Sequence, residues 1–173
     1  SGHHECVQAL IDADAAVDMV DDDGRTALML ACSLGHHECA QALIDAGAAV
    51  DMVDDDGDTA LIHACFLGSY ECTRALVDAR ANLELTNSGG KNALMIACES
   101  PPSCYSQSQS QGRVKCALAL LESMAPIREA DSLDWAATLA FACERLQFIE
   151  VVLASTHVIE DAPLLARARA LKT

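Results

Sequence analysis

The chain has 173 residues, 51% of them hydrophobic, which is enough for a continuous core, and its formal net charge is −15. A protein this acidic repels nucleic-acid phosphates and anionic membrane surfaces, so neither is expected as a partner. No apolar run reaches the roughly 20 residues that cross a bilayer, so we expect no direct membrane insertion.

Residues 1–20 match only the second half of a longer unit. Residues 3–28 return at 36–61 with an offset of 33, and only three of the 26 aligned positions differ. A fixed period of about 20 to 50 residues is the signature of stacked repeats, which build extended binding surfaces. Because the chain begins inside a repeat, we expect it to be a piece of a longer protein or a chain whose first repeat packs on another molecule.

Residues 21–53 and 54–86 form two complete units. In the first, residues 27–31 and 39–44 both carry apolar side chains at the i, i+3, i+4 spacing of a helix. A glycine-histidine pair between them indicates a turn, and a polar loop over 50–57 that ends in Asp-Gly indicates a hairpin. Each unit is therefore predicted to contain a helix, a turn, a second helix and a hairpin loop.

Residues 87–126 form a third unit that an insertion interrupts. Eleven more residues lie between Cys98 and Cys116 than between the equivalent cysteines of the complete units. Two prolines stop the helix there, and the run of serine and glutamine that follows offers no apolar side chains to fold around. We expect a solvated loop over 100–111.

The last region, 127–173, keeps two weaker helix-like patterns and a final apolar stretch that begins at Pro163. Large aromatic side chains are concentrated here and suit an end that closes a stack of repeats. We therefore predict a degenerate repeat followed by a capping helix. The aromatic residues are Trp135, Phe141 and Phe148.

The first complete unit, 21–53, has the sequence DDDGRTALMLACSLGHHECAQALIDAGAAVDMV and resembles an ankyrin repeat. The shared features are Asp-x-x-Gly-x-Thr, leucine and alanine at helical spacing, a Gly-His turn and a leucine-rich second helix, in a unit of the same length. The resemblance extends over 1–126. It implies an all-α solenoid of about four to five stacked helix-turn-helix repeats with short β-hairpin loops, forming a single domain over 1–173.

Two residues depart from the family motif, because its Thr-Pro-Leu-His is Thr-Ala-Leu-Met here, at 26–29. The resemblance implies that the missing histidine weakens hydrogen bonds that tie the loops together. Alanine is a good helix former, so the fold is expected to survive the loss of the proline.

The chain has nine cysteines, and all but Cys104, which lies in the inserted loop, occupy helix positions where the family places Ala or Val. Stacking of the family type separates equivalent residues by about 10 Å, beyond the limit of about 7 Å between the Cα atoms of a disulfide. Buried free cysteine acts as a small hydrophobic residue. We therefore expect reduced thiols and an intracellular, reducing compartment, by default the cytoplasm, with an organelle as the other case.

The resemblance also implies a non-catalytic module that binds a partner protein through a concave groove and its loop tips. Residues 1–100 hold 18 of the 26 acidic side chains and only 4 of the 11 basic ones, which favours a partner with a basic surface. Candidate contacts lie at the loop tips, at the residue that follows the loop glycine in each unit, and at the end of the first helix of each unit. They are Asp22, Asp23, Arg25, Ser33, Leu34, Asp55, Asp56, Asp58, Phe66, Leu67, Lys91 and Glu99.

Other interpretations stay open at this point. The acidic tips are also typical of solvated turns, the alternating signs at Arg25, Asp58 and Lys91 could be purely structural, and Phe66 could pack against the insertion. The chain could be a structural subunit held in a larger assembly by its ends or convex face. It could also be the ankyrin arm of an enzyme whose catalytic domain lies elsewhere.

The sequence His-His-Glu-Cys occurs twice, at 3–6 and 36–39, and these residue types include zinc ligands. Zinc needs ligands that converge, whereas a repeat spreads equivalent residues along the stack. The Asp-Asp-Asp-Gly loops lack the later glutamate of a calcium-binding loop. A nucleophile with its base and a glycine-rich phosphate loop are also lacking, so we expect no metal, no cofactor and no catalytic residue.

Overall fold

The structure is a computed structural model that describes residues 2–99 and 107–124, so the predictions for 127–173 lie outside the described residues. Seven helices lie within these ranges, and none of them combines the length and the apolar character that a membrane span needs. The helices are α1 (Gly2–Asp12), α2 (Ala27–Leu34), α3 (His37–Asp45), α4 (Ala60–Leu67), α5 (Tyr70–Asp78), α6 (Ala93–Cys98) and α7 (Gln107–Met124).

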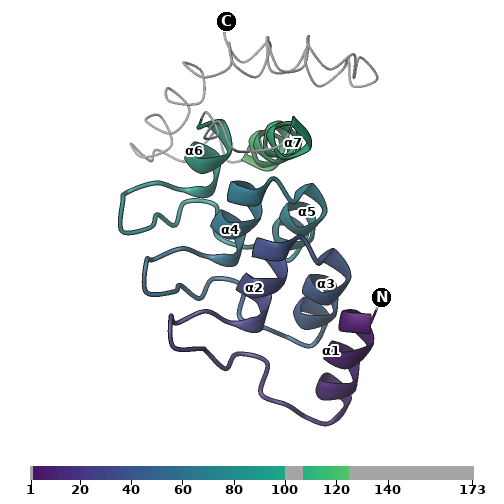
Figure 1. The fold of residues 1–173 in the computed structure, drawn as a ribbon. Helices are drawn as coiled ribbons and strands as arrows, with labels where there is room; N and C mark the ends of the chain where they lie inside the picture. The colour runs from purple at the N-terminus through teal and green to yellow at the C-terminus, as the bar shows by residue number, and fades with distance from the viewer. Residues whose placement is uncertain (1, 100–106, 125–173) are drawn as a thin grey trace, which may run out of the picture.

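The helices form two stacked layers (Figure 1). One layer holds α2, α4 and α6, and the other holds α1, α3, α5 and α7. Three loops project beyond the first layer, and each is closed by one isolated β-bridge, while the described residues form no sheet. The bridged pairs are Val20 with Thr26, Val53 with Thr59, and Thr86 with Asn92. This architecture confirms the predicted all-α solenoid of helix-turn-helix units with short hairpin loops.

Each helix of the first layer begins at a polar cap that recurs with the repeat. The side chains of Thr26, Thr59 and Asn92 accept a hydrogen bond from the backbone N–H three residues on, at 3.2, 3.2 and 2.9 Å. Such a cap satisfies a donor that the first helical turn leaves unpaired. Gly35 and Gly68 end α2 and α4 with φ angles of 74° and 82°, a region that favours glycine.

Neighbouring loops are tied to one another although the motif histidine is absent. The Asp55 N–H donates to the Asp23 carbonyl oxygen at 3.2 Å, and the Ser88 N–H donates to the Asp56 carbonyl oxygen at 2.9 Å. Two aspartate side chains also accept hydrogen bonds from backbone N–H groups of the next unit. These pairs are Asp18 with Ala49 at 2.9 Å and Asp51 with Asn82 at 2.8 Å. The missing histidine therefore does not leave the loops untied.

The core consists of columns of equivalent residues that run along the stack. Leu28, Leu61 and Leu94 are almost completely buried, and Cys32 and Cys65 are fully buried. Burial of one such leucine side chain contributes about 1.5–3 kcal/mol to the stability of the fold. Because each column passes through successive units, no unit buries its apolar face alone.

The described cysteines are free, and the thiols that meet belong to different columns. Cys32 of α2 hydrogen-bonds with Cys72 of α5, and Cys65 of α4 hydrogen-bonds with Cys116 of α7. These hydrogen bonds, together with burial, raise the pKa of the Cys32 and Cys65 thiols well above its ordinary value. Both thiols are therefore neutral and act as small hydrophobic groups.

The insertion differs from its prediction. The sequence predicts a loop over 100–111, but α7 begins at Gln107, so the last five positions of that loop are helical. Tertiary packing explains the difference, because α7 lies so close to the turn between α4 and α5 that a Cβ at Gly112 would collide with the Gly68 carbonyl oxygen. Arg113, in the next position, is 3% exposed. Contacts with another unit thus stabilise a helix that the local composition does not favour.

Candidate partner-binding face

The three projecting loops and the exposed side of α2, α4 and α6 form one surface, which we call the inner face (Figure 1). Its loops are residues 20–26, 53–59 and 86–92. All twelve predicted contact residues lie on these loops or at the ends of these helices. Because the loops are tied and the helices are capped, the inner face exists without a partner.

Acidic side chains gather at the loop tips of the inner face. Asp22, Asp23, Asp55 and Asp56 are exposed, and the Arg25 guanidinium lies 2.6 Å from the Asp23 carboxylate. Charges on successive tips are partly screened, because the Debye length is about 8 Å at physiological salt. The tips can therefore coexist without a partner and still attract an approaching basic surface.

Contacts inside the chain hold the basic residues that follow the loop glycine in the first and third units. Arg25 donates through Nε and Nη2 to Asp21 Oδ2, at 3.1 and 2.9 Å. Lys91 Nζ lies 2.6 Å from Glu99 Oε1. The hydrogen bond from Arg25 holds the pKa of the Asp21 carboxyl below its usual range. Both basic residues thus pair within their own unit and not with Asp58 in the column between them.

Apolar side chains are exposed beside the acidic tips. Leu34 is 64% exposed and Phe66 is 48% exposed, whereas Leu67 is half-buried and Ser33 is hydrogen-bonded within its own helix. The guanidinium of Arg113 lies 5.8 Å from the centre of the Phe66 ring. One part of Phe66 therefore packs against α7, at a residue just after the insertion, and the rest of the ring faces solvent.

Two exposed valines belong to the same surface and were not among the predicted contacts. Val20 and Val53 are each about half exposed, and each takes part in the β-bridge that closes its loop. Their spacing equals the 33-residue period, and each directly precedes an aspartate run. That recurrence is the signal in the sequence that could have identified them.

One group of metal-ligand side chains converges on the inner face within the described part of the chain. Asp54, Asp58 and His63 each offer one ligand atom, and these atoms all lie within 4.8 Å of one another. His63 Nε2 is 2.8 Å from Asp54 Oδ2, and the Asp54 side chain is only 6% exposed. Asp54 and His63 were not predicted contacts. The signal for His63 is that the preceding unit has Leu30 at the equivalent position.

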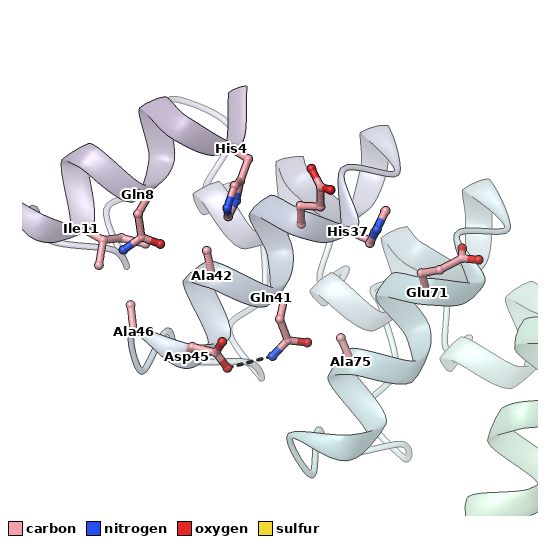
Figure 2. Close-up of a pocket in the computed structure, with 11 residues that line it drawn as sticks. His4, Gln8, Ile11, His37, Gln41, Ala42, Asp45, Ala46, Glu71 and Ala75 are labelled. Atoms are coloured by element: carbon pink, nitrogen blue, oxygen red, sulfur yellow. Dashed lines mark hydrogen bonds between the residues drawn. The ribbon is translucent and has the colours of Figure 1, made fainter. Parts of the chain in front are cut away.

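A hollow of about 540 Å³ lies between α1, α3 and α5, in the helix layer away from the loops (Figure 2). His4 and His37, from the two His-His-Glu-Cys sequences, line this hollow, whereas Cys39 is buried in the core. The Gln41 amide donates to the Asp45 carboxylate at 2.8 Å across its floor. Within the described residues, the converging group of metal-ligand side chains includes no member of the two His-His-Glu-Cys sequences.

Comparison with known proteins identifies a family. A family model described as ankyrin repeats, in three copies, matches residues 1–54 and 47–131 of the chain. No curated protein matches it. The roles of individual residues on the inner face therefore rest on their geometry.

Proposed function

Because the chain belongs to the ankyrin-repeat family, we propose that it is a non-catalytic module that binds a partner protein through its inner face. Ankyrin repeats are generally protein–protein interaction modules and are typically non-catalytic. The observation that carries the proposal is a set of exposed apolar side chains beside the exposed acidic loop tips. These apolar residues are Val20, Leu34, Val53 and Phe66.

The two kinds of side chain have different roles in this proposal. The acidic tips raise the rate of encounter with a basic surface, an effect that falls as salt is added. Phe66 and Leu34 supply apolar contact area, which slows dissociation once water is excluded around them. The hydrogen bonds between the loops lower the entropy lost on binding, because the surface is ordered beforehand.

Charge reversal on the two faces tests where the partner binds. Asp55→Lys with Asp56→Lys alters the inner face, and Glu38→Lys with Glu71→Lys makes the same change of charge at exposed positions of α3 and α5. Cross-linked capture from native extract identifies the partner, whose affinity for each purified variant is then measured. We expect the inner pair to weaken binding more than tenfold and the outer pair less than twofold. Equal binding by both variants would contradict the proposal.

The hollow between α1, α3 and α5 favours one second candidate. The chain would then be a structural subunit held in a larger assembly by its outer helix layer, which consists of α1, α3, α5 and α7. Selective loss of the partner in the Glu38 and Glu71 variant would support this candidate and reject the inner face. An enzyme that uses the inner face to hold its substrate is the remaining case, and sequencing of the gene would show whether a catalytic domain accompanies these repeats.

A further inference from the structure

The two complete units differ at positions that cluster around one point. Only three positions differ between 3–28 and 36–61, and one of them places Asp58 where the preceding unit has Arg25. Five residues further on, His63 stands where the preceding unit has Leu30 and the following unit has an isoleucine. The middle unit has therefore lost a cation and gained an imidazole at neighbouring positions of the same loop and helix.

These two changes place three ligand-type side chains together, and the two carboxylates are held in place by further hydrogen bonds. Asp54 Oδ1 accepts the N–H groups of Asp56 and Asp58 at 3.1 and 2.8 Å, while its Oδ2 faces His63 Nε2 at 2.8 Å. Asp58 Oδ1 accepts a hydrogen bond from the Asn87 amide at 2.8 Å. Outer hydrogen bonds of this kind orient the ligands of metal sites before the metal arrives.

The charge in this cluster also differs from that of its neighbours. In the first unit the Arg25 guanidinium neutralises Asp21 at 2.9 Å, and in the third unit the equivalent of Asp21 is the uncharged Asn87. In the middle unit two carboxylates lie near one imidazole, which is hydrogen-bonded to Asp54, and the Asp54 side chain is nearly buried. A divalent cation would supply the missing positive charge at the point where the three side chains meet.

We propose that Asp54, Asp58 and His63 form a three-ligand site for a divalent transition metal, with zinc as the best match. Two carboxylate oxygens and one imidazole nitrogen are ligands that zinc accepts, and water completes an open tetrahedral site. Binding replaces the hydrogen bond between Asp54 and His63 with one bond from each to the metal. The imidazole then uses the Nε2 lone pair and carries its proton on Nδ1. This inference does not depend on the proposed partner.

The site is tested by titrating zinc into the metal-free chain and measuring the heat of binding by calorimetry. Accessible thiols are alkylated beforehand so that they do not bind the metal. His63→Leu and Asp58→Arg restore the residues of the preceding unit, so the fold is expected to persist, and circular dichroism without metal checks this. Each variant should lose at least about tenfold in zinc affinity. Asp58→Asn, which keeps the shape of the side chain, should also weaken binding.

Two control variants separate this site from other ligands. Asp55→Asn with Asp56→Asn removes acidic charge from the same loop, and His36→Ser with His37→Tyr gives α3 the residues that α5 has at these positions. Both should bind zinc within about twofold of the unaltered chain. Three results would overturn the proposal: no zinc binding by the unaltered chain, unchanged affinity in the folded His63→Leu and Asp58→Arg variants, or loss of binding confined to the His36 and His37 variant.

Discussion

Units 21–53 and 54–86 share the residues that build the stack and differ in many of those that face outward. Leu28 and Leu61 are both buried, and Thr26 and Thr59 form the same cap at the same distance. On the inner face, by contrast, one loop carries an arginine and the next an aspartate, and the helices behind them present serine in one unit and phenylalanine in the other. Stacking therefore constrains the buried and capping positions, while the exposed positions are free to acquire binding chemistry.

Substitution of a shared buried residue should have the largest effect. Leu61→Ala removes a side chain that is 1% exposed and leaves a cavity between units, so it should cost about 2–5 kcal/mol of unfolding free energy. Leu34→Ala removes the same atoms at an exposed position and should change stability by less than about 0.5 kcal/mol. Urea unfolding measures both. Equal losses of unfolding free energy in the two variants would contradict the distinction between buried and exposed positions.

Removal of the shared cap should have a smaller and equal effect in the two units. Thr26→Ala and Thr59→Ala each delete a side-chain acceptor that lies 3.2 Å from a helix N–H. Each should cost about 1 kcal/mol, which is typical of a lost N-cap. The same urea measurement, made on each variant separately, would show a difference well above 1 kcal/mol if the two units were not equivalent.

Substitution of a residue that differs between the units should affect stability still less. Phe66→Ser copies the first unit, and the lost contact with the buried Arg113 is of the cation–π type, worth about 0.5–1 kcal/mol because the Phe66 ring is half exposed to solvent. Thermal unfolding should therefore stay close to that of the unaltered chain, while dissociation from the partner becomes faster. A stability loss above about 2 kcal/mol would place Phe66 in the core and remove it from the inner face.

The smallest predicted effect is a change in the pKa of Asp21, the acid that pairs with Arg25. The pKa of Asp21 is lowered by its hydrogen bond with Arg25, so its folded value lies below that of the unfolded chain. The resulting stabilisation is complete above the unfolded-state pKa and is lost as the pH falls through the folded-state pKa. Arg25→Asp copies the second unit and should raise the pKa of Asp21 toward its ordinary value. Carboxyl titration by NMR would detect this, and an unchanged pKa would contradict the pairing.

The repeat period predicts the parts of the fold that depend on local sequence. The apolar stretches at 27–31 and 39–44 fall inside α2 and α3, and the Gly-His pair marks the turn between them. The caps and the turn need only residues close in the chain, so a single unit contains the necessary information. The twelve contact candidates lie on the loops and helix ends, and their role as contacts stays a prediction.

Features that need two units escaped prediction because they depend on distances across the stack. The start of α7 is set by packing against a turn about 40 residues earlier. The Cys32 thiol meets Cys72, which belongs to a different column. Asp58 is oriented by Asn87 from the next loop. Comparison of the two complete units residue by residue, rather than a search for known motifs, would have pointed to His63.

Site-specific photo-cross-linking tests the central claim, that the inner face binds the partner. A benzophenone amino acid is placed at position 66 on α4 or at position 41 on α3, so that each variant probes one face of the same folded chain. The partner should form an adduct with the probe at 66 and not with the probe at 41. An adduct with the probe at 41 alone would place the partner on the outer helix layer and contradict the account.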